Sequence, residues 1–235
     1  MRMACARRHS FDIARAGYIN LLQPQDRRSR NPGDTAAAVA GRQRLHERGV
    51  MAPLRAGITE LLSAGHEDVV LDAGCGDGYY LGDCAAETHG VDISVPAIEL
   101  AAKRYPRGEW IVANADRFVP YADRSFSRIM SITARMHPPE FRRVLREDGR
   151  LLVALPSPED LVELRGRGRD RVARTVDEFA GEFRLSRQER VTTTADLDAS
   201  AVEDVLHSIY RPLRTGPAAA MPLTFSLDLL LFRLA

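Results

Sequence analysis

Residues 69–80 read VVLDAGCGDGYY, an apolar run that ends in a turn with three alternate glycines. The run Val69–Leu71 is typical of a strand buried on both faces. Glycines directly after such a strand permit a tight turn and let a ligand approach the backbone closely. The stretch therefore predicts a parallel strand, a ligand-binding turn at Gly74, Gly76 and Gly78, and a helix after the turn.

The spacing of this turn and the acid before it indicate which ligand it binds. A dinucleotide site uses the spacing GxGxxG, with a pyrophosphate on the helix N-terminus. Here the spacing is D-x-G-x-G-x-G, and Asp72 at the strand end would repel a pyrophosphate. A carboxylate at this place suits the sulfonium and amino groups of S-adenosylmethionine, which we therefore expect as the cofactor.

Two further acids follow the next two predicted strands. Asp92 comes 20 residues after Asp72, the offset at which a carboxylate holds ribose hydroxyls in such folds. Ile93, next to it, is included in the predicted cofactor site, and Asp116 is expected to accept a hydrogen bond from the exocyclic adenine amine. The alternative is a structural turn with incidental acids. Three acids at three consecutive strand ends favour a binding crevice at a topological switch point.

The rest of the chain alternates predicted strands with predicted helices. Strands are expected near residues 88–92, 109–113, 126–132 and 149–155, and helices near residues 34–47, 51–63, 95–104 and 137–146. Asp34 and Ser94 are expected to N-cap two of these helices, and Gly49 is expected to end the first. The alternation predicts a doubly wound α/β fold with a mainly parallel sheet. We expect a basic arm at residues 1–50 and a cofactor-binding domain at residues 51–235.

Charge is distributed unevenly along the chain. Residues 1–55 hold 11 arginines and 4 acids, whereas the rest holds 22 basic residues and 28 acids. A basic segment on an acidic body suggests an anionic partner such as nucleic acid. An arginine bias of the genome would give the same pattern, since Lys103 is the sole lysine. The sequence shows neither an apolar run long enough for a membrane helix nor a secretory signal, so we expect a cytoplasmic location and no membrane partner.

Several short motifs resemble one enzyme family. They are CARRHSFDIARAGYINLL at residues 5–22, RSRNPGD at 28–34, GDGYY at 76–80, AAKRYP at 101–106 and PPEFRRVL at 138–145. Residues 66–156 resemble class I S-adenosylmethionine-dependent methyltransferases. This resemblance implies a seven-stranded, Rossmann-like sheet with a reversed last strand, for which Leu223–Leu234 is the candidate. The arm resembles the 23S ribosomal RNA (guanine-N1)-methyltransferases, which include macrolide-resistance enzymes; this implies 23S ribosomal RNA as partner and a tendency to form homodimers.

The arm departs from the family pattern at its metal site. In the family, a CxxC pair precedes a Cys-x3-His element, and the four ligands bind zinc. This chain holds Cys5 and His9 of that set, and two ligands do not make a structural zinc site. Either the first half is missing from the gene model or the metal has been lost. We expect no stoichiometric zinc and interpret Cys5 and His9 as a relic half-site.

The segment after the fourth predicted strand, residues 131–138, is expected to border the methyl acceptor. Guanine N1 carries a proton at neutral pH, so the reaction needs a proton acceptor or a group that stabilises charge on O6. Arg135 is the candidate for the O6 charge and His137 for the proton. The alternative for His137 is an ordinary residue near a helix start.

Three functions remain open at this point. They are an RNA guanine-N1 methyltransferase, a small-molecule methyltransferase derived from this family, and a catalytically silent binding module. The intact donor motif argues against the third function, and the incomplete zinc element favours the second. The arm motif favours the first.

Overall fold

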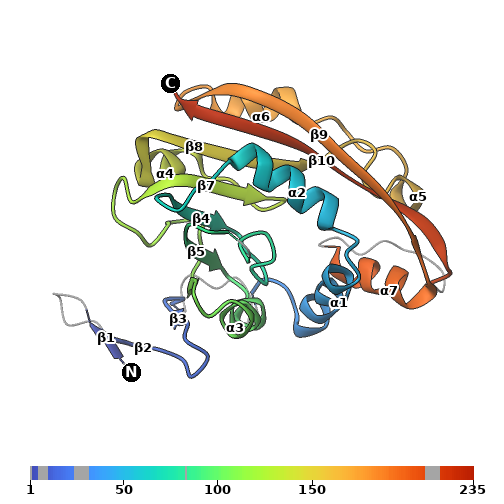
Figure 1. Ribbon diagram of the computed structural model, residues 1–235, viewed down its shortest axis with the longest axis horizontal. Coiled ribbons are helices and arrows are strands. Elements are labelled where there is room, and N and C mark those ends of the chain that lie inside the picture. Colours follow the sequence, from blue (N-terminus) through green and yellow to red (C-terminus); the bar gives the residue numbers. More distant parts are fainter. Residues whose placement is uncertain (1, 5–9, 24–31, 83, 210–217) are drawn as a thin grey trace.

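A central sheet of eight strands organises the computed structural model, which describes residues 2–4, 10–23, 32–82, 84–209 and 218–235. The strand order is β3-β6-β5-β4-β7-β8-β10-β9, so the order reverses between β4 and β7. Helices lie on both sides of this sheet (Figure 1). The predicted doubly wound α/β fold is confirmed, and the reversal point is where such folds form a binding crevice.

The five inner strands run parallel to one another. Their bounds are β4 (Val69–Ala73), β5 (Glu87–Asp92), β6 (Glu109–Val112), β7 (Phe126–Ile132) and β8 (Leu145–Pro156). β10 (Met221–Leu234) pairs antiparallel with β8 and with β9 (Phe183–Leu197). The predicted reversed last strand is therefore confirmed, and it begins two residues earlier than expected.

Two strands of this sheet were not predicted. β9 reads FRLSRQERVTTTADL, and between its buried ends its residues are exposed or half-buried, so no apolar pattern marks it. β3 (Ile19–Asn20) comes from the arm and pairs parallel with β6. The implied seven-stranded sheet is present as β6-β5-β4-β7-β8-β10-β9, and the arm adds β3 as an eighth strand at its edge.

Helices bury apolar side chains against each face of the sheet. On one face lie α1 (Ala36–Glu47), α2 (Ala52–Leu62), α3 (Val95–Arg104) and α7 (Ala199–Ser208). On the other face α4 (Pro138–Val144) and α6 (Val172–Phe179) bury Phe141 and Phe179. A short helix, α5 (Val162–Arg165), follows β8. Within the described residues, no helix is both long enough and apolar enough to cross a bilayer.

The helix ends follow from their capping residues, with one correction. Thr35 rather than Asp34 caps α1, because the Thr35 hydroxyl accepts the N–H of Ala38 at 3.2 Å. Ser94 caps α3 as predicted, and Gly49 follows α1 in the left-handed region with a φ of 73°. The predicted helix at residues 137–146 is shorter than expected, since it ends at Val144 and β8 begins at once.

No helix follows the glycine turn within residues 74–82 and 84–86, contrary to the prediction. The chain passes from β4 to β5 through successive turns, in which Gly78 N–H donates to Cys75 O and Leu81 N–H to Gly78 O. The physical reason is length, because residues 74–86 must hold both the turn and the return to the start of a parallel strand. The residues of this connection pack instead against α1, where the His46 ring stacks on the Tyr79 ring with a centroid distance of 3.8 Å.

The arm begins with an antiparallel ribbon of β1 (Arg2–Ala4) and β2 (Ser10–Asp12), at one corner of the molecule (Figure 1). The predicted half-site Cys5 and His9 lies outside the described residues. Further along, α1 packs on α7, where Arg44 Nε donates to Asp204 Oδ2 at 2.9 Å. The boundary expected at residue 50 stays a prediction.

Candidate functional site

The carboxylate of Asp72 is buried at the end of β4 without a hydrogen-bond partner. Its relative exposure is 1%, and neither oxygen bonds to any described residue. Burial, and after it the charges of Asp92 and Asp77, raises the pKa of Asp72 well above its ordinary value. A buried carboxylate without a partner is costly to the folded protein, so this position is suited to a cationic ligand.

The glycine turn directly follows Asp72 in the chain, and two of its three glycines leave no room for a side chain. Gly74, Gly76 and Gly78 have φ values of 91°, 53° and 76°, in the region that favours glycine. A Cβ on Gly74 would overlap Ala134, and one on Gly78 would overlap the ring of Trp110. Glycine at these two positions is therefore required by the packing of the turn against Ala134 and Trp110, whereas a Cβ on Gly76 would make only an ordinary contact.

Asp92 fixes the turn from the end of the neighbouring strand β5. Its Oδ2 accepts the N–H of Gly76 at 2.9 Å, and its Oδ1 accepts the N–H of Ser94 at 2.8 Å. Burial raises the pKa of Asp92, although these two N–H groups act in the opposite direction. Each carboxylate oxygen has a second acceptor position, so Asp92 and the adjacent half-buried Ile93 fit the predicted ribose side of the site.

Asp116 and Arg135 lie beside each other, although the sequence analysis assigned Asp116 to the adenine of the donor and Arg135 to the methyl acceptor. Asp116 follows β6 and Arg135 follows β7, and Arg135 Nε lies 3.5 Å from Asp116 Oδ2. Both side chains are exposed, so the pair contributes little to stability. Both are accessible to a substrate at the same end of the sheet as the glycine turn.

His137 N-caps α4. Its Nδ1 accepts the N–H of Glu140 at 3.3 Å. Four residues earlier, Thr133 has a φ of 52°, a left-handed conformation that is strained for a branched side chain. The segment that carries Arg135 and His137 is thus held between a strained strand end and a capped helix. Its catalytic role stays a prediction.

The residues at the end of β4 and β5 fit S-adenosylmethionine. Asp72 offers an unpaired buried carboxylate for a cationic group, and Asp92 offers acceptors for ribose hydroxyls. When bound, this donor supplies a methyl group on a sulfonium. Among the described residues no cluster of His, Cys, Asp and Glu could hold a metal ion.

The sequence analysis did not predict that side chains of α1 contact the glycine turn. His46 Nδ1 lies 3.1 Å from Asp77 Oδ2, and both side chains are buried. Burial acts to raise the pKa of Asp77, but the hydrogen bond with His46 and the charges of His46 and Arg42 lower it. No local signal marks these partners, because α1 precedes the turn by some 30 residues. The one sequence feature that pointed to such contacts is that a helix with polar residues precedes the glycine turn.

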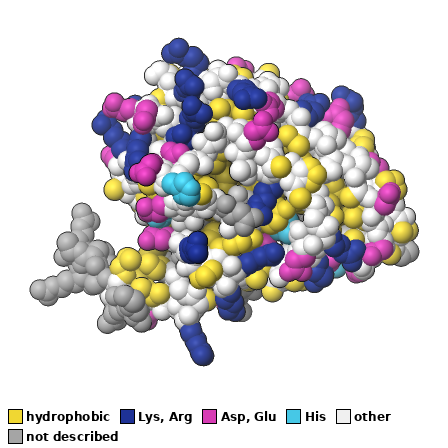
Figure 2. Space-filling model, viewed as in Figure 1, with side chains coloured by type: hydrophobic (Ala, Val, Ile, Leu, Met, Phe, Trp, Pro, Cys, Tyr) yellow, Lys and Arg dark blue, Asp and Glu magenta, His cyan; other side chains and the backbone are white. Residues whose placement is uncertain are grey.

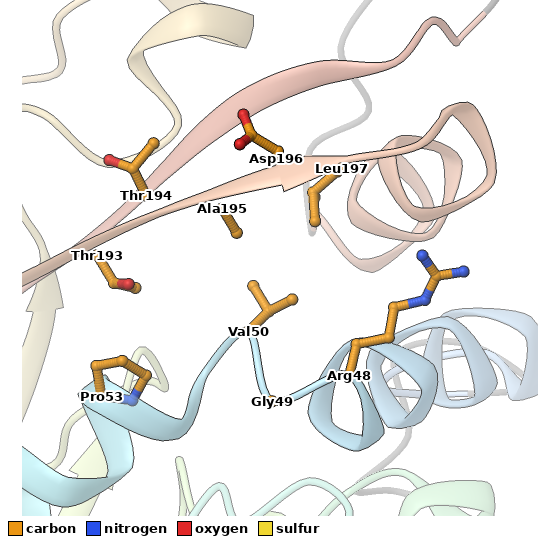
Figure 3. Close-up of a pocket in the computed structure, with 9 residues that line it drawn as sticks. All are labelled: Arg48, Gly49, Val50, Pro53, Thr193, Thr194, Ala195, Asp196 and Leu197. Carbon is orange, nitrogen blue, oxygen red and sulfur yellow. The ribbon is translucent and has the colours of Figure 1, made fainter.

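A cavity of about 280 Å³ lies elsewhere, between β9 and the connection from α1 to α2. Figure 3 shows Val50 and Pro53 on one side and alternate β9 residues, Ala195 and Leu197, facing them. None of the predicted site residues lines it. The predicted donor site at the strand ends and this cavity are therefore separate features of the fold.

Replacing Asp92 by Ala is expected to weaken donor binding at least about tenfold. The change removes acceptors for ribose hydroxyls, and each hydrogen bond to a charged group contributes about 1.5–3 kcal/mol. It also releases the N–H groups of Gly76 and Ser94, which hold the turn. Titration calorimetry with S-adenosylmethionine measures the effect, and unchanged affinity would contradict the assignment.

Comparison with known proteins identifies relatives of this chain. A family model described as "Methyltransferase domain" matches residues 70–154, and one described as "RlmA, N-terminal" matches residues 1–30. The 23S rRNA (guanine(748)-N(1))-methyltransferase of Streptomyces fradiae is 35% identical over 223 residues, which cover 87% of this chain and 77% of that enzyme. The YxjB protein of Bacillus subtilis is 34% identical over 226 residues, covering 87% of this chain and 78% of YxjB.

A solved structure shares the fold at low sequence identity. The YcgJ protein from Bacillus subtilis superposes with a TM-score of 0.52 at 18% identity, covering 76% of this chain and 95% of YcgJ. The two relatives that match over 87% of this chain decide the family, since matches of that extent include both the arm and the methyltransferase domain. The chain is an S-adenosylmethionine-dependent methyltransferase and belongs to the 23S rRNA (guanine-N1)-methyltransferase family.

Proposed function

We propose that this enzyme methylates N1 of a guanine in a hairpin of 23S ribosomal RNA. The observation that carries the proposal is the 35% identity, over 87% of this chain, to an enzyme named for that reaction. Such a substrate is found with the ribosome, so we place the protein in the cytoplasm. A homodimer stays a prediction.

The reaction forms a bond from guanine N1 to the methyl carbon as the bond from that carbon to sulfur breaks, and the N1 proton leaves. Arg135 is the group proposed to stabilise charge on O6, because its guanidinium is exposed beside the donor site. His137 is proposed to take the proton. A neutral imidazole whose Nδ1 accepts the Glu140 amide carries its own proton on Nε2, so His137 must release that amide, or change tautomer, in order to act.

The arm is proposed to position the RNA. Arg27, Arg28 and Arg30 would contact phosphates, and these residues lie outside the described part of the chain. On the face shown in Figure 2, basic side chains are interspersed with acidic ones, so the described residues there do not form a patch of one sign. The target base must be free of pairing, because N1 lies on the edge used for base pairing. We propose that Cys5 and His9 by themselves do not hold stoichiometric zinc, since two ligands are too few for a structural site.

The deciding experiment incubates the enzyme with labelled S-adenosylmethionine and undermethylated 23S ribosomal RNA. Primer extension is expected to stop at one guanine, because an N1 methyl group blocks pairing. The Asp92→Ala variant serves as the control with a damaged donor site. Label that enters a small molecule and not the RNA would overturn the proposal.

Two substitutions are expected to slow methyl transfer about 100-fold without weakening donor binding. Arg135→Met removes the charge proposed to stabilise O6, and its exposure means that folding is unaffected. His137→Asn removes the proton acceptor, while Asn is itself a good N-cap for α4. Single-turnover rates measure both effects. If His137→Asn transfers methyl at the wild-type rate, His137 is a helix cap and has no catalytic role.

A further inference from the structure

The glycine turn of this enzyme lacks the positive helix end that commonly faces a bound anion. Residues 74–82 and 84–86 form turns and no helix, so no helix N-terminus points at the site from this connection. S-adenosylmethionine carries a carboxylate on its methionine moiety as well as two cationic groups. Asp72 suits the cationic groups, but its charge and those of Asp77 and Asp92 would repel that carboxylate.

A guanidinium from α1 lies at this turn. A Cβ built on Gly76 would be 3.6 Å from Arg42 Nη1, in ordinary contact. Burial acts to lower the pKa of Arg42, but Asp34, Asp77 and Asp92 raise it overall, which shows that its charge faces the carboxylates of the site. The side chain keeps a relative exposure of 27%, so a ligand can reach it.

Contacts of Arg42 itself, and contacts at both ends of α1, hold Arg42 in place. At the N-terminal end, Arg42 Nη1 pairs with Asp34 Oδ2 at 2.6 Å, and the Asp34 carbonyl accepts the Ser94 hydroxyl at 2.8 Å. At the C-terminal end, His46 pairs with Asp77 of the turn itself. Arg42 Nη2 also donates to the Ser208 carbonyl at 3.2 Å. The cation is thus fixed against the turn before any ligand binds, which lowers the entropy that binding would otherwise lose.

We propose that Arg42 binds the carboxylate of the donor's methionine moiety. The guanidinium fork matches a carboxylate in shape and charge, and it lies next to the backbone of Gly76. Asp72 then faces the cationic part of the same ligand from the other side of the turn. The inference concerns the donor alone, so it stands whether or not the RNA substrate is correct.

Decarboxylated S-adenosylmethionine tests this assignment, because it keeps the sulfonium and amino groups and lacks only the carboxylate. We expect the wild type to prefer S-adenosylmethionine over this analogue at least about tenfold in Kd. Arg42→Met is expected to bind both compounds equally, and Arg42→Lys to keep part of the preference. Titration calorimetry on each folded variant gives the dissociation constants.

Arg44→Met is the matched control, since Arg44 is on the same helix but pairs with Asp204 of α7. It is expected to keep the wild-type preference. Asp34→Asn keeps Arg42 and removes its acidic partner, so its preference is expected to be at least as large as that of the wild type. If Arg42→Met does not fold, Arg42→Lys answers the question, because a preference below that of the wild type supports the assignment and an unchanged preference contradicts it. A wild type that binds both compounds equally, or a folded Arg42→Met that still discriminates, would overturn the proposal.

Discussion

Replacing Asp72 by Asn is expected to raise the free energy of unfolding of the ligand-free enzyme by about 1–3 kcal/mol at neutral pH. The same change is expected to weaken binding of S-adenosylmethionine at least about tenfold, because a cationic ligand loses its buried carboxylate. The reason for the gain in stability is that both Asp72 oxygens are buried without a partner. Chemical denaturation and calorimetry measure the two effects on the same protein.

The stability gain of this variant should depend on pH in a defined direction. Burial raises the folded-state pKa of Asp72, so the folded protein binds more protons than the unfolded chain above the ordinary Asp pKa. The wild type therefore loses stability as pH rises from about 4 toward the folded pKa, and the advantage of Asn grows over that range. Below this range the two proteins should be similarly stable.

Asp198 provides a control in which the dependence of stability on pH has the opposite sign. It caps α7 and pairs with Arg48, and the hydrogen bond from Ala201 N–H, followed by those from Arg48 and Ser200, lowers its pKa. Its contribution to stability is present above the ordinary Asp pKa and is lost as pH falls. Asp198→Asn should leave donor binding unchanged. If Asp72→Asn destabilises the ligand-free enzyme at neutral pH, the Asp72 carboxylate has a stabilising partner in the folded protein.

Replacing Gly74 by Ala is expected to destabilise the enzyme by about 2–5 kcal/mol and to abolish measurable methyl transfer. The left-handed φ of 91° costs an Ala about 1–2 kcal/mol. The new Cβ would also overlap the Cβ of Ala134, and such overpacking typically costs about 1–3 kcal/mol more. Ala134 directly precedes Arg135, so the displacement reaches the proposed acceptor side of the site.

The two parts of this effect can be separated with a matched glycine. Gly49 has a similar φ of 73°, but nothing lies within 4 Å of a Cβ built there. Gly49→Ala should therefore cost about 1 kcal/mol and leave methyl transfer intact. Adding Ala134→Gly to Gly74→Ala removes the overlapping atom and should restore part of the activity. Equal effects of Gly74→Ala and Gly49→Ala would mean that the contact with Ala134 is unimportant.

Local sequence determined the elements that form the donor site. The run from Val69 to Gly78 specifies a strand and a turn through β-branched residues and glycines, whose conformational preferences depend on few neighbours. Ser94 likewise specifies the start of α3 through one hydrogen bond within its own turn. The acid at the end of β5 could be placed because parallel strands bring their carboxyl ends to one edge.

Tertiary structure decided the contacts between residues far apart in the chain. The pairing of polar β9 with β10, the addition of β3 to β6, and the position of Arg42 against Gly76 have no local signal. Periodicity reports which face of an element is buried but not which partner buries it, so these contacts depend on how the whole chain packs.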